Sequence, residues 1–411
     1  MQTNLNYLNQ ELKLPCGAVL KNRIGKSAMS ENMANKDHKI NQKFIHLYKR
    51  WAYGGAGLLL TGNIMIDSKA LGEPRNVVFE KENIDPLLKD WANSGKENNT
   101  HFWTQLNHPG KQAPKFLSKS PVAPSAIPFR SPLNKAFSTP RELTEKEIYE
   151  IIERFTFAAK LSKDSGFSGV QIHGAHGYLV SQFLSPKHNI REDDWGGTPK
   201  KRMRFVSKLY ESIRKEVGKN FPVGIKLNSA DFQRGGFTKH ESMEVVEYLS
   251  SEGMDLIEIS GGTYESPVMM GETKKESTKE REAYFLDYCE EVRKKVKTPL
   301  MLTGGFRSLE TMNKAIQSGV CDLIGLGRSI VIQPEFPNDL LSGKNIKSMV
   351  KPLSTGIKIL DSIIPLEITW YTEQIHRIGK GLNPIPDRNA LASAIHTVLD
   401  FGLEGLKRVR V

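Results

Sequence analysis

Short apolar runs alternate with longer amphipathic segments along most of the chain. Each run ends in small or polar residues, and all but the first are rich in Val, Ile, Leu or aromatic residues. Such runs are typical of strands that are buried on both faces of a parallel sheet. The pattern predicts eight strands, at residues 23–30, 57–63, 101–108, 169–176, 223–229, 256–262, 300–306 and 323–329.

The segments between the strands have the spacing of helices. The clearest is 144–162, where Thr144 and Glu147 form a capping-box pattern at the start. Its apolar stripe follows the i, i+3, i+4, i+7 rule and consists of Ile148, Ile151, Ile152, Phe155, Ala158 and Ala159. Further helices are predicted at about 40–53, 200–217, 240–252, 282–296 and 308–318, and three of them are followed by Gly218, Gly253 and Gly319, as helix C-termini commonly are.

Strands and helices that alternate eight times predict an α/β fold, a (β/α)8 TIM barrel over residues 1–340. A doubly wound sheet would need a glycine-rich turn early in the chain, and none is present. The Pro- and Ser-rich segment 111–143 is expected to be a long loop over the site. Residues 341–411, with helix-like pieces at 353–379 and 389–406, are expected to form a C-terminal helical extension packed on the barrel or on a neighbouring subunit in a homo-oligomer.

Composition excludes several classes of protein. The 411 residues carry 58 Lys and Arg against 46 Asp and Glu, a net charge of +12, with 38% hydrophobic residues, so global disorder is not expected. The basic residues are spread and mixed with acids, which favours a solvated surface over a nucleic-acid interface and mildly attracts small anions. The sequence shows neither a membrane span nor a secretory signal, and its three cysteines form no CxxC motif, so a cytoplasmic protein without a zinc or iron–sulfur site is expected.

Candidate chemistry lies at the ends of the predicted strands, where barrels carry their active sites. Thr303, Gly304 and Gly305 end the seventh strand, and Gly327 and Arg328 end the eighth. Glycines allow backbone N–H groups to approach a phosphate, and arginine can bind it through two hydrogen bonds. The last two loops therefore predict a site for a phosphorylated ligand.

Lys226 stands inside the apolar fifth strand, where an uncompensated charge is costly. The structural interpretation is that it reaches the rim or pairs with Asp231 or Glu258. The functional interpretation is a counter-charge for an anion that forms during catalysis, and a third is a Schiff-base nucleophile like that of an aldolase.

The fourth strand ends in the run HGAHGY, which contains His173, His176 and Tyr178. A metal site would need a third ligand, for which His108 is available, but no acidic cluster accompanies the histidines, so no metal is expected. A purely structural role is a further alternative. The preferred hypothesis is two hydrogen-bond donors for a substrate oxygen beside a phenol that donates a proton.

These motifs, taken in order, resemble the Old Yellow Enzyme family of FMN-dependent NAD(P)H:flavin oxidoreductases and ene-reductases. The resemblance covers roughly residues 10–340 and rests on LKNRIGKSAM, QLNHPGKQ, GVQIHGAHGYLVSQFLSPKHNIREDDWGGTPKKRMRF, GIKLNSADF, EISGG, LTGGF and DLIGLGRS. The fourth-strand run is the most characteristic of them.

The resemblance implies a role for each matching residue. Ser27, Ala28, Met29 and Ser30 would line one side of a tightly but non-covalently bound FMN, with Gly62 close by and Gln105 at the pyrimidine edge. Lys226 would lie near flavin N1 and O2, where a fixed cation raises the reduction potential, and Thr303, Gly304, Gly305, Gly327 and Arg328 would hold the phosphate. His173 and His176 would bind a carbonyl or nitro oxygen of the substrate, and Tyr178 would protonate the α-carbon of the alkene. NAD(P)H would supply the hydride from the same pocket.

Three positions depart from common family patterns. Ser30 stands where relatives often carry Thr or Cys, Asn32 occupies a substrate-pocket position that is Tyr in some relatives, and Gln112 replaces a basic residue of one subgroup. The cysteines and the length argue against the dienoyl-CoA reductase type with its cluster. The competing functions are an RNA dihydrouridine-synthase-like FMN enzyme that uses a cysteine, an aldolase that uses Lys226, and a non-catalytic barrel that binds a phosphorylated ligand.

Overall fold

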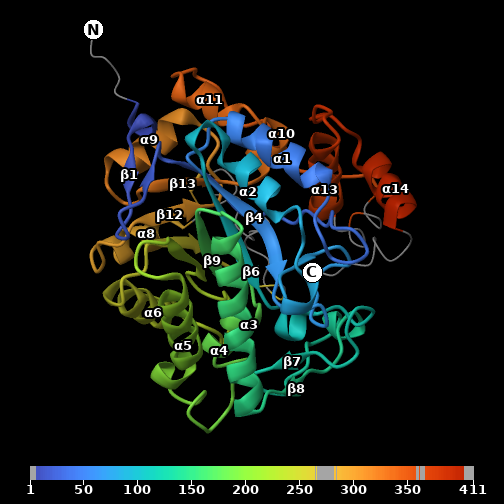
Figure 1. Ribbon diagram of the computed structural model, residues 1–411, viewed down its shortest axis with the longest axis vertical. Coiled ribbons are helices and arrows are strands. Elements are labelled where there is room, and N and C mark those ends of the chain that lie inside the picture. Colours follow the sequence, from blue (N-terminus) through green and yellow to red (C-terminus); the bar gives the residue numbers. More distant parts are fainter. Residues whose placement is uncertain are drawn as a thin grey trace.

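The fold is a closed barrel of parallel strands surrounded by helices (Figure 1). The computed structural model describes residues 6–263, 265, 282–283, 285–357, 361 and 366–401. Within these residues the barrel strands, in chain order, are β3 (Ile24–Lys26), β4 (Leu58–Met65), β6 (His101–Asn107), β9 (Gly169–Gly174), β10 (Val223–Asn228), β11 (Leu256–Ser260), β12 (Leu300–Thr303) and β13 (Leu323–Leu326). Parallel pairing of β13 with β3 closes the barrel, so the predicted fold and all eight predicted strands are confirmed.

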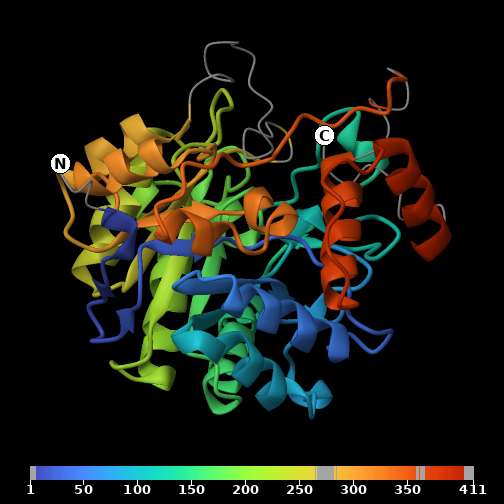
Figure 2. The same ribbon diagram turned by 90° about the horizontal axis from the view of Figure 1, so that it is seen from above.

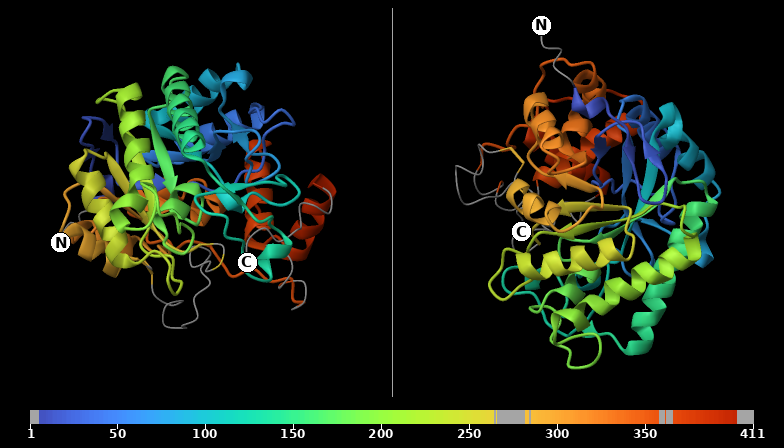
Figure 3. Two further views of the ribbon diagram at one scale, coloured as in Figure 1. Left: turned by 90° about the horizontal axis from the view of Figure 1, so that it is seen from below. Right: turned by 90° about the vertical axis from the view of Figure 1, so that its left-hand side faces the viewer.

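The helices lie outside the strands (Figure 3). They are α1 (Gln42–Tyr53), α2 (Leu88–Lys96), α3 (Glu145–Asp164), α4 (Leu179–Leu184), α5 (Pro199–Val217), α6 (Lys239–Ser251), α8 (Leu286–Arg293), α9 (Leu309–Gln317), α10 (Arg328–Ile332) and α11 (Phe336–Leu341). The capping box of α3 is confirmed: the Glu147 backbone N–H donates to Thr144 Oγ1 (3.3 Å), and the Thr144 N–H donates to a Glu147 carboxylate oxygen (2.9 Å). The sequence pattern did not reveal α2, and α8 is shorter than the predicted helix at 282–296. Within the described residues no helix is both long and apolar enough to cross a membrane.

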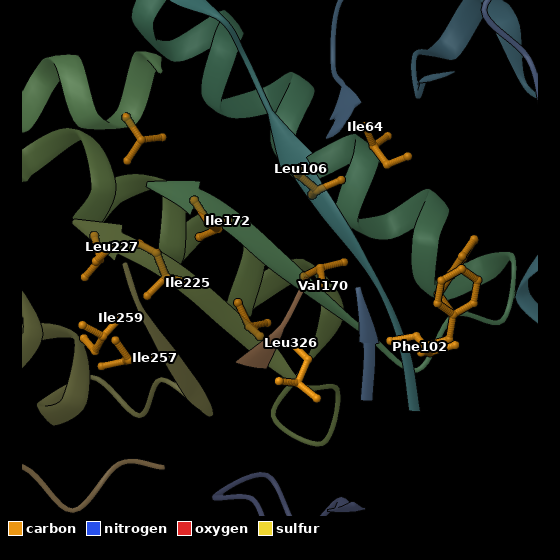
Figure 4. Close-up of a cluster of buried hydrophobic side chains, with 14 of the residues drawn as sticks. Ile64, Phe102, Leu106, Val170, Ile172, Ile225, Leu227, Ile257, Ile259 and Leu326 are labelled. Carbon is orange, nitrogen blue, oxygen red and sulfur yellow. The ribbon is translucent and has the colours of Figure 1, made fainter. Parts of the chain in front are cut away.

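Two apolar layers build the core. The outward side chains of the strands pack against the helices, and several of them are labelled in Figure 4, from Ile64 on β4 to Leu326 on β13. A second cluster fills the N-terminal half of the barrel interior with Leu58, Leu60, Trp103, Leu256, Met301 and Leu323. Leu12, Leu14 and Leu20 join it from the hairpin of β1 (Leu12–Lys13) and β2 (Val19–Leu20), so this end of the barrel is closed by apolar side chains.

The segment 111–143 lies on the other end of the barrel and is partly regular. It contains β7 (Val122–Ala123) and β8 (Arg141–Glu142), which pair with each other. It also contains the 3-10 turn η5 (Leu133–Lys135), and the 3-10 turn η4 (Gly110–Gln112) begins one residue before the segment. Phe129, Leu133 and Phe137 of this segment form a buried cluster with Tyr178. The loop therefore covers the end of the fourth barrel strand.

The C-terminal extension contains α13 (Leu366–Gly379) and α14 (Ala390–Phe401). Figure 2 shows both helices beside the barrel, with α13 next to α1 and α14 packed on α13. Helix α13 packs on α1 and α10, and the carbonyl oxygen of Glu31 lies 2.8 Å from His376 Nε2. The extension thus lies against the barrel, while the boundary at residue 340 stays a prediction.

Candidate active site

A cavity of about 500 Å³ opens among the carboxyl ends of the barrel strands. This volume is in the range of pockets that hold cofactors and other small ligands. Residues from all eight barrel strands or the turns that follow them line it, and α13 supplies a further wall. The predicted site residues that line it are Ser27, Ala28, Met29, Ser30, Gln105, His173, His176, Tyr178, Lys226, Thr303, Gly304, Gly305, Gly327 and Arg328.

Two of the predicted site residues do not line this cavity. Gly62 instead allows a close approach of the chain after β3: a Cβ at this position would lie 2.6 Å from the Met29 carbonyl oxygen, and the Gly62 N–H donates to Glu31 (3.1 Å). Asn32 has a left-handed backbone (φ 44°), and its side-chain oxygen accepts from the Arg75 N–H (2.9 Å). The structure therefore gives Asn32 a bracing role in its loop, and Asn32 is not among the residues that line the pocket.

Ser30 and Gln112, the other two positions that depart from common family patterns, each form a hydrogen bond with another residue of the protein. The Ser30 hydroxyl donates to the Glu73 carboxylate, so its proton is engaged by the protein itself. The Gln112 amide donates to the His176 carbonyl oxygen (3.1 Å). Gln112 therefore holds the turn that carries the second histidine.

Lys226 is buried and paired. Its Nζ lies 3.0 Å from Glu258 Oε1, whereas Asp231 accepts hydrogen bonds from Ser185 (2.7 Å) and from the Phe237 N–H (3.0 Å). Of the two carboxylates that the sequence offered, the partner is Glu258. The ion pair engages the amine, whereas a Schiff-base lysine needs a neutral amine, so the geometry disfavours the aldolase hypothesis.

The two histidines and the tyrosine meet on one wall of the cavity. The ring centroid of His173 lies 5.1 Å from that of His176 and 4.8 Å from that of Tyr178. His173 Nδ1 accepts from the Ala175 N–H (3.3 Å), which leaves Nε2 as the donor. His176 has a left-handed φ of 61°, its N–H donates to Asn228 (3.1 Å), and its Nε2 lies 2.9 Å from Ser260 Oγ. A left-handed backbone conformation that surrounding hydrogen bonds hold in place is common at functional sites.

His108 does not join this pair. It is buried outside the cavity lining, and its Nδ1 accepts from the Gly110 N–H (3.0 Å). Burial lowers the pKa of this imidazole to about 4. Among the described residues no group of three or more His, Cys, Asp or Glu side chains is arranged to hold a metal ion. The third ligand that the metal hypothesis required is therefore not supplied by His108.

None of the three cysteines is among the described residues that line the cavity. Burial raises the pKa of Cys16 to about 11 and that of Cys289 to about 12, and Cys321 is also buried. A thiol that donates a proton to a substrate must lie in the pocket, so this geometry does not support the cysteine-dependent RNA-modifying hypothesis.

The far end of the cavity has the features of a phosphate site. Gly304 and Gly305 both have positive φ angles, of 132° and 82°, and Arg328 lies beside them in the lining. The Arg328 guanidinium lies 3.2 Å from the carboxylate of Glu367 on α13. Sequence reasoning missed this helix as part of the site, because its spacing predicts a helix but not the surface that the helix covers.

Two buried polar atoms of the lining residues have no hydrogen-bond partner among the described residues: the Asn63 side-chain oxygen and the Tyr371 hydroxyl. Buried polar groups are nearly always satisfied, so these atoms indicate that the cavity takes a polar ligand. A buried cation, an amide, left-handed glycines and an arginine are the groups that a flavin mononucleotide needs. The residues present therefore fit FMN.

Comparison with known proteins decides the family. The model of the NADH:flavin oxidoreductase / NADH oxidase family matches residues 14–346. The chain belongs to the Old Yellow Enzyme family. It is 38% identical over 357 residues to the NADH-dependent flavin oxidoreductase iccE of Talaromyces variabilis, a match that covers 82% of this chain and 86% of the relative.

Solved structures share the fold of this chain. The structure of an Old Yellow Enzyme homologue from Zymomonas mobilis superimposes with a TM-score of 0.71 at 24% identity, over 84% of this chain and 94% of that one. A 2-naphthoyl-CoA reductase in complex with 2-naphthoyl-CoA superimposes with a TM-score of 0.77 at 25% identity, over 84% of this chain, which spans only 54% of that longer protein. As a member of the Old Yellow Enzyme family, the protein is an FMN-dependent oxidoreductase that uses NAD(P)H.

Proposed function

We propose that the protein reduces an activated alkene, either an α,β-unsaturated carbonyl compound or a nitroalkene, with NAD(P)H as the electron donor. The observation that supports this most strongly is the grouping of His173, His176 and Tyr178 on one wall of the cavity that also contains Lys226 and Gln105. Two imidazoles and a phenol together can bind an oxygen and deliver a proton.

The remaining lining residues hold the cofactor in this proposal. The ring system would be held by Ser27, Ala28, Met29 and Ser30 together with Lys226 and Gln105. The phosphate would be held by Thr303, Gly304, Gly305, Gly327 and Arg328, where backbone N–H groups and a guanidinium complement its charge. When bound, FMN supplies hydride chemistry to the pocket, with NAD(P)H as the source of the electrons.

The histidines and the tyrosine act on the substrate. His173 donates from Nε2 to the carbonyl or nitro oxygen, and His176 binds the same oxygen. These hydrogen bonds withdraw electron density from the alkene, so the β-carbon becomes the position that accepts a hydride. Tyr178 then transfers its phenolic proton to the α-carbon, which completes the addition of one hydride and one proton across the double bond.

The loop 111–143 shields this chemistry from water. Phe129, Leu133 and Phe137 pack against Tyr178, whose side chain is only 2% exposed. Exclusion of water strengthens the hydrogen bonds within the pocket and keeps the tyrosine proton for the substrate.

Replacement of Tyr178 by Phe tests the proposal. The variant keeps the ring and removes the proton, so enone reduction should slow by roughly 10²–10⁴-fold. Reduction of the bound flavin by NAD(P)H requires no proton from Tyr178 and should stay nearly unchanged. Anaerobic stopped-flow measurement of the two half-reactions separates these effects.

Tyr53→Phe is the matched control, because Tyr53 is 54% exposed on α1, outside the cavity. It should leave both half-reactions unchanged. Equal losses in both half-reactions of Tyr178→Phe would contradict the proton-donor assignment, as would unaltered enone turnover.

A further inference from the structure

Glu258 lies at the centre of the barrel, and none of the roles assigned above uses it. It is completely buried in the middle of β11, and its neighbours Ile257 and Ile259 point outward into the core (Figure 4). The strand register places Glu258 beside Lys226 of β10 on one side and Met301 of β12 on the other. Its carboxylate therefore faces the interior, one layer from the cavity.

The Glu258 carboxylate contacts three polar side chains from three other strands. Oε1 lies 3.0 Å from Lys226 Nζ and accepts a hydrogen bond from the Thr303 hydroxyl (2.8 Å). Oε2 accepts from the Gln171 amide nitrogen (2.8 Å). Two of these partners line the cavity, while Gln171 lies behind it.

The network continues to two more lining residues. Gln171 Oε1 accepts from the Gln105 amide nitrogen (2.7 Å), and Ser27 Oγ lies 2.8 Å from Thr303 Oγ1. Four residues of the cavity wall, which are Ser27, Gln105, Lys226 and Thr303, are thus joined to one carboxylate.

An ionised carboxylate only accepts hydrogen bonds, so it sets the direction of every bond that follows. Gln171 must present its N–H to Glu258 and its oxygen to Gln105, which leaves the Gln105 oxygen as the free acceptor. Thr303 must give its proton to Glu258, so Ser27 becomes the donor to Thr303. The carboxylate therefore fixes which donors and acceptors the wall offers to a ligand.

Glu258 also balances charge. Lys26 and Glu31 are buried nearby, and Lys26 interacts electrostatically with Glu31, Lys226 and Glu258. Two buried lysines thus lie among two buried glutamates. Without Glu258 the cavity would face an uncompensated Lys226.

We propose that Glu258 is a positioning residue of the cofactor site, which orients Gln105 and Thr303 and offsets the charge of Lys226, so that it lowers the reduction potential of the bound flavin. This inference rests on the proposed cofactor roles of these lining residues. Glu258 acts through Lys226, Thr303 and Gln171 and does not itself contact the cofactor.

Glu258→Gln tests the charge effect, because glutamine keeps the shape and removes the charge. The potential of bound FMN should shift in the positive direction, because the negative charge of the reduced flavin is then better compensated. We expect about a tenfold change in the ratio of the dissociation constants of oxidised and reduced FMN, or roughly 30 mV for a two-electron couple. Spectroscopic titration against reference dyes at pH 6 measures the shift, and Glu258→Asp should restore most of the wild-type value.

Gln171→Met tests the orientation of Gln105 through Gln171, and it is informative even if Glu258→Gln does not fold. It removes the hydrogen bonds that Gln171 makes with Glu258 and with Gln105 and keeps the Lys226–Glu258 ion pair, so oxidised FMN should bind about three- to tenfold more weakly, with little change in potential. Quenching of flavin fluorescence on binding measures this affinity. Asp255→Asn is the matched control, because Asp255 precedes the same strand at the closed end of the barrel and should change neither quantity.

The outcomes separate the two proposals. If the wild-type protein does not bind FMN, both this inference and the proposed function are wrong. If it binds FMN but Glu258→Gln keeps the wild-type potential, or Gln171→Met keeps the wild-type affinity, the positioning role of Glu258 is wrong and the proposed function stands. A shift of equal size in Asp255→Asn would likewise contradict the positioning role.

Discussion

Asp255 immediately precedes strand β11 and Glu258 lies in the middle of the same strand, and their surroundings differ. Asp255 forms an ion pair with Arg214 and accepts from the backbone N–H groups of Val223 and Cys16, both at 2.8 Å. Asp322 repeats this arrangement before β13, where it pairs with Arg293 and accepts from the Leu300 N–H (2.9 Å). Each of these aspartates ties its strand to the neighbouring strand beside an apolar layer.

Glu258 instead bonds to side chains that open onto the cavity. The comparison shows how one fold uses buried charge in two ways. The partners of one carboxylate are backbone N–H groups and an arginine, which tie neighbouring strands together, whereas two partners of the other carboxylate line the cavity. The division agrees with the general location of barrel active sites at the carboxyl ends of the strands.

Replacement of Asp255 by Asn should have the largest effect on stability. It leaves Arg214 partly buried without its counter-charge, which we expect to lower the free energy of unfolding by about 3 kcal/mol. Urea denaturation of the FMN-free protein measures this loss. Unaltered stability would show that the closed end of the barrel does not depend on this ion pair.

Replacement of Arg328 by Ala should weaken FMN binding and leave the stability of the FMN-free protein nearly unchanged. Loss of a charged hydrogen-bond donor to phosphate should weaken FMN binding by roughly 10–100-fold, while unfolding of the FMN-free protein changes little, because the Arg328–Glu367 pair is about a third exposed. Fluorescence titration with FMN and with riboflavin gives the affinities. Riboflavin lacks the phosphate and should bind the wild-type protein and the variant with equal affinity. If the variant lost as much affinity for riboflavin as for FMN, Arg328 would not be a phosphate ligand.

Replacement of His173 or His176 by Ala should weaken binding of a phenol by about tenfold each, because each variant loses one hydrogen bond to the ligand oxygen. The charge-transfer absorption of a phenol on oxidised flavin is the readout. His240→Ala is the control, because the His240 side chain is 85% exposed on α6. Wild-type affinity in both cavity variants would contradict the role of the two histidines.

The smallest expected effect concerns His108, a buried histidine near the site but outside the cavity. The pKa of its imidazole is about 4 in the folded protein, against the ordinary 6.5. As the pH falls from 6.5 towards 4, the unfolded chain binds a proton that the folded chain does not, so stability falls. His108→Gln should remove about 1 kcal/mol of the loss between pH 6.5 and 5, as seen in urea denaturation at each pH, and an unchanged slope would contradict it.

The sequence predicted the barrel and most of the cavity wall because both follow from local patterns. Apolar runs define the strands, and barrel topology brings the ends of the strands together, so His173, Lys226 and Arg328 could be placed near each other before the structure was known. Thr144 and Glu147 likewise define the start of α3 through local chemistry.

Other features depend on geometry that no local pattern contains. Glu258 joins the cavity wall through its register with Lys226, and α13 forms part of the wall because of where the tail packs. Asn32 lies in the correct loop, but a left-handed backbone turns its side chain to the Arg75 N–H. Tertiary packing, and not local sequence, sets the positions of these groups.

Quantification of flavin released from the purified protein by denaturation tests the central claim most directly. The account predicts a yellow protein that releases FMN, about one molecule per chain, and a FMN-free form that regains its colour when FMN is added. A colourless protein that does not bind added FMN would contradict the assignment of the carboxyl ends of the barrel strands as a flavin site.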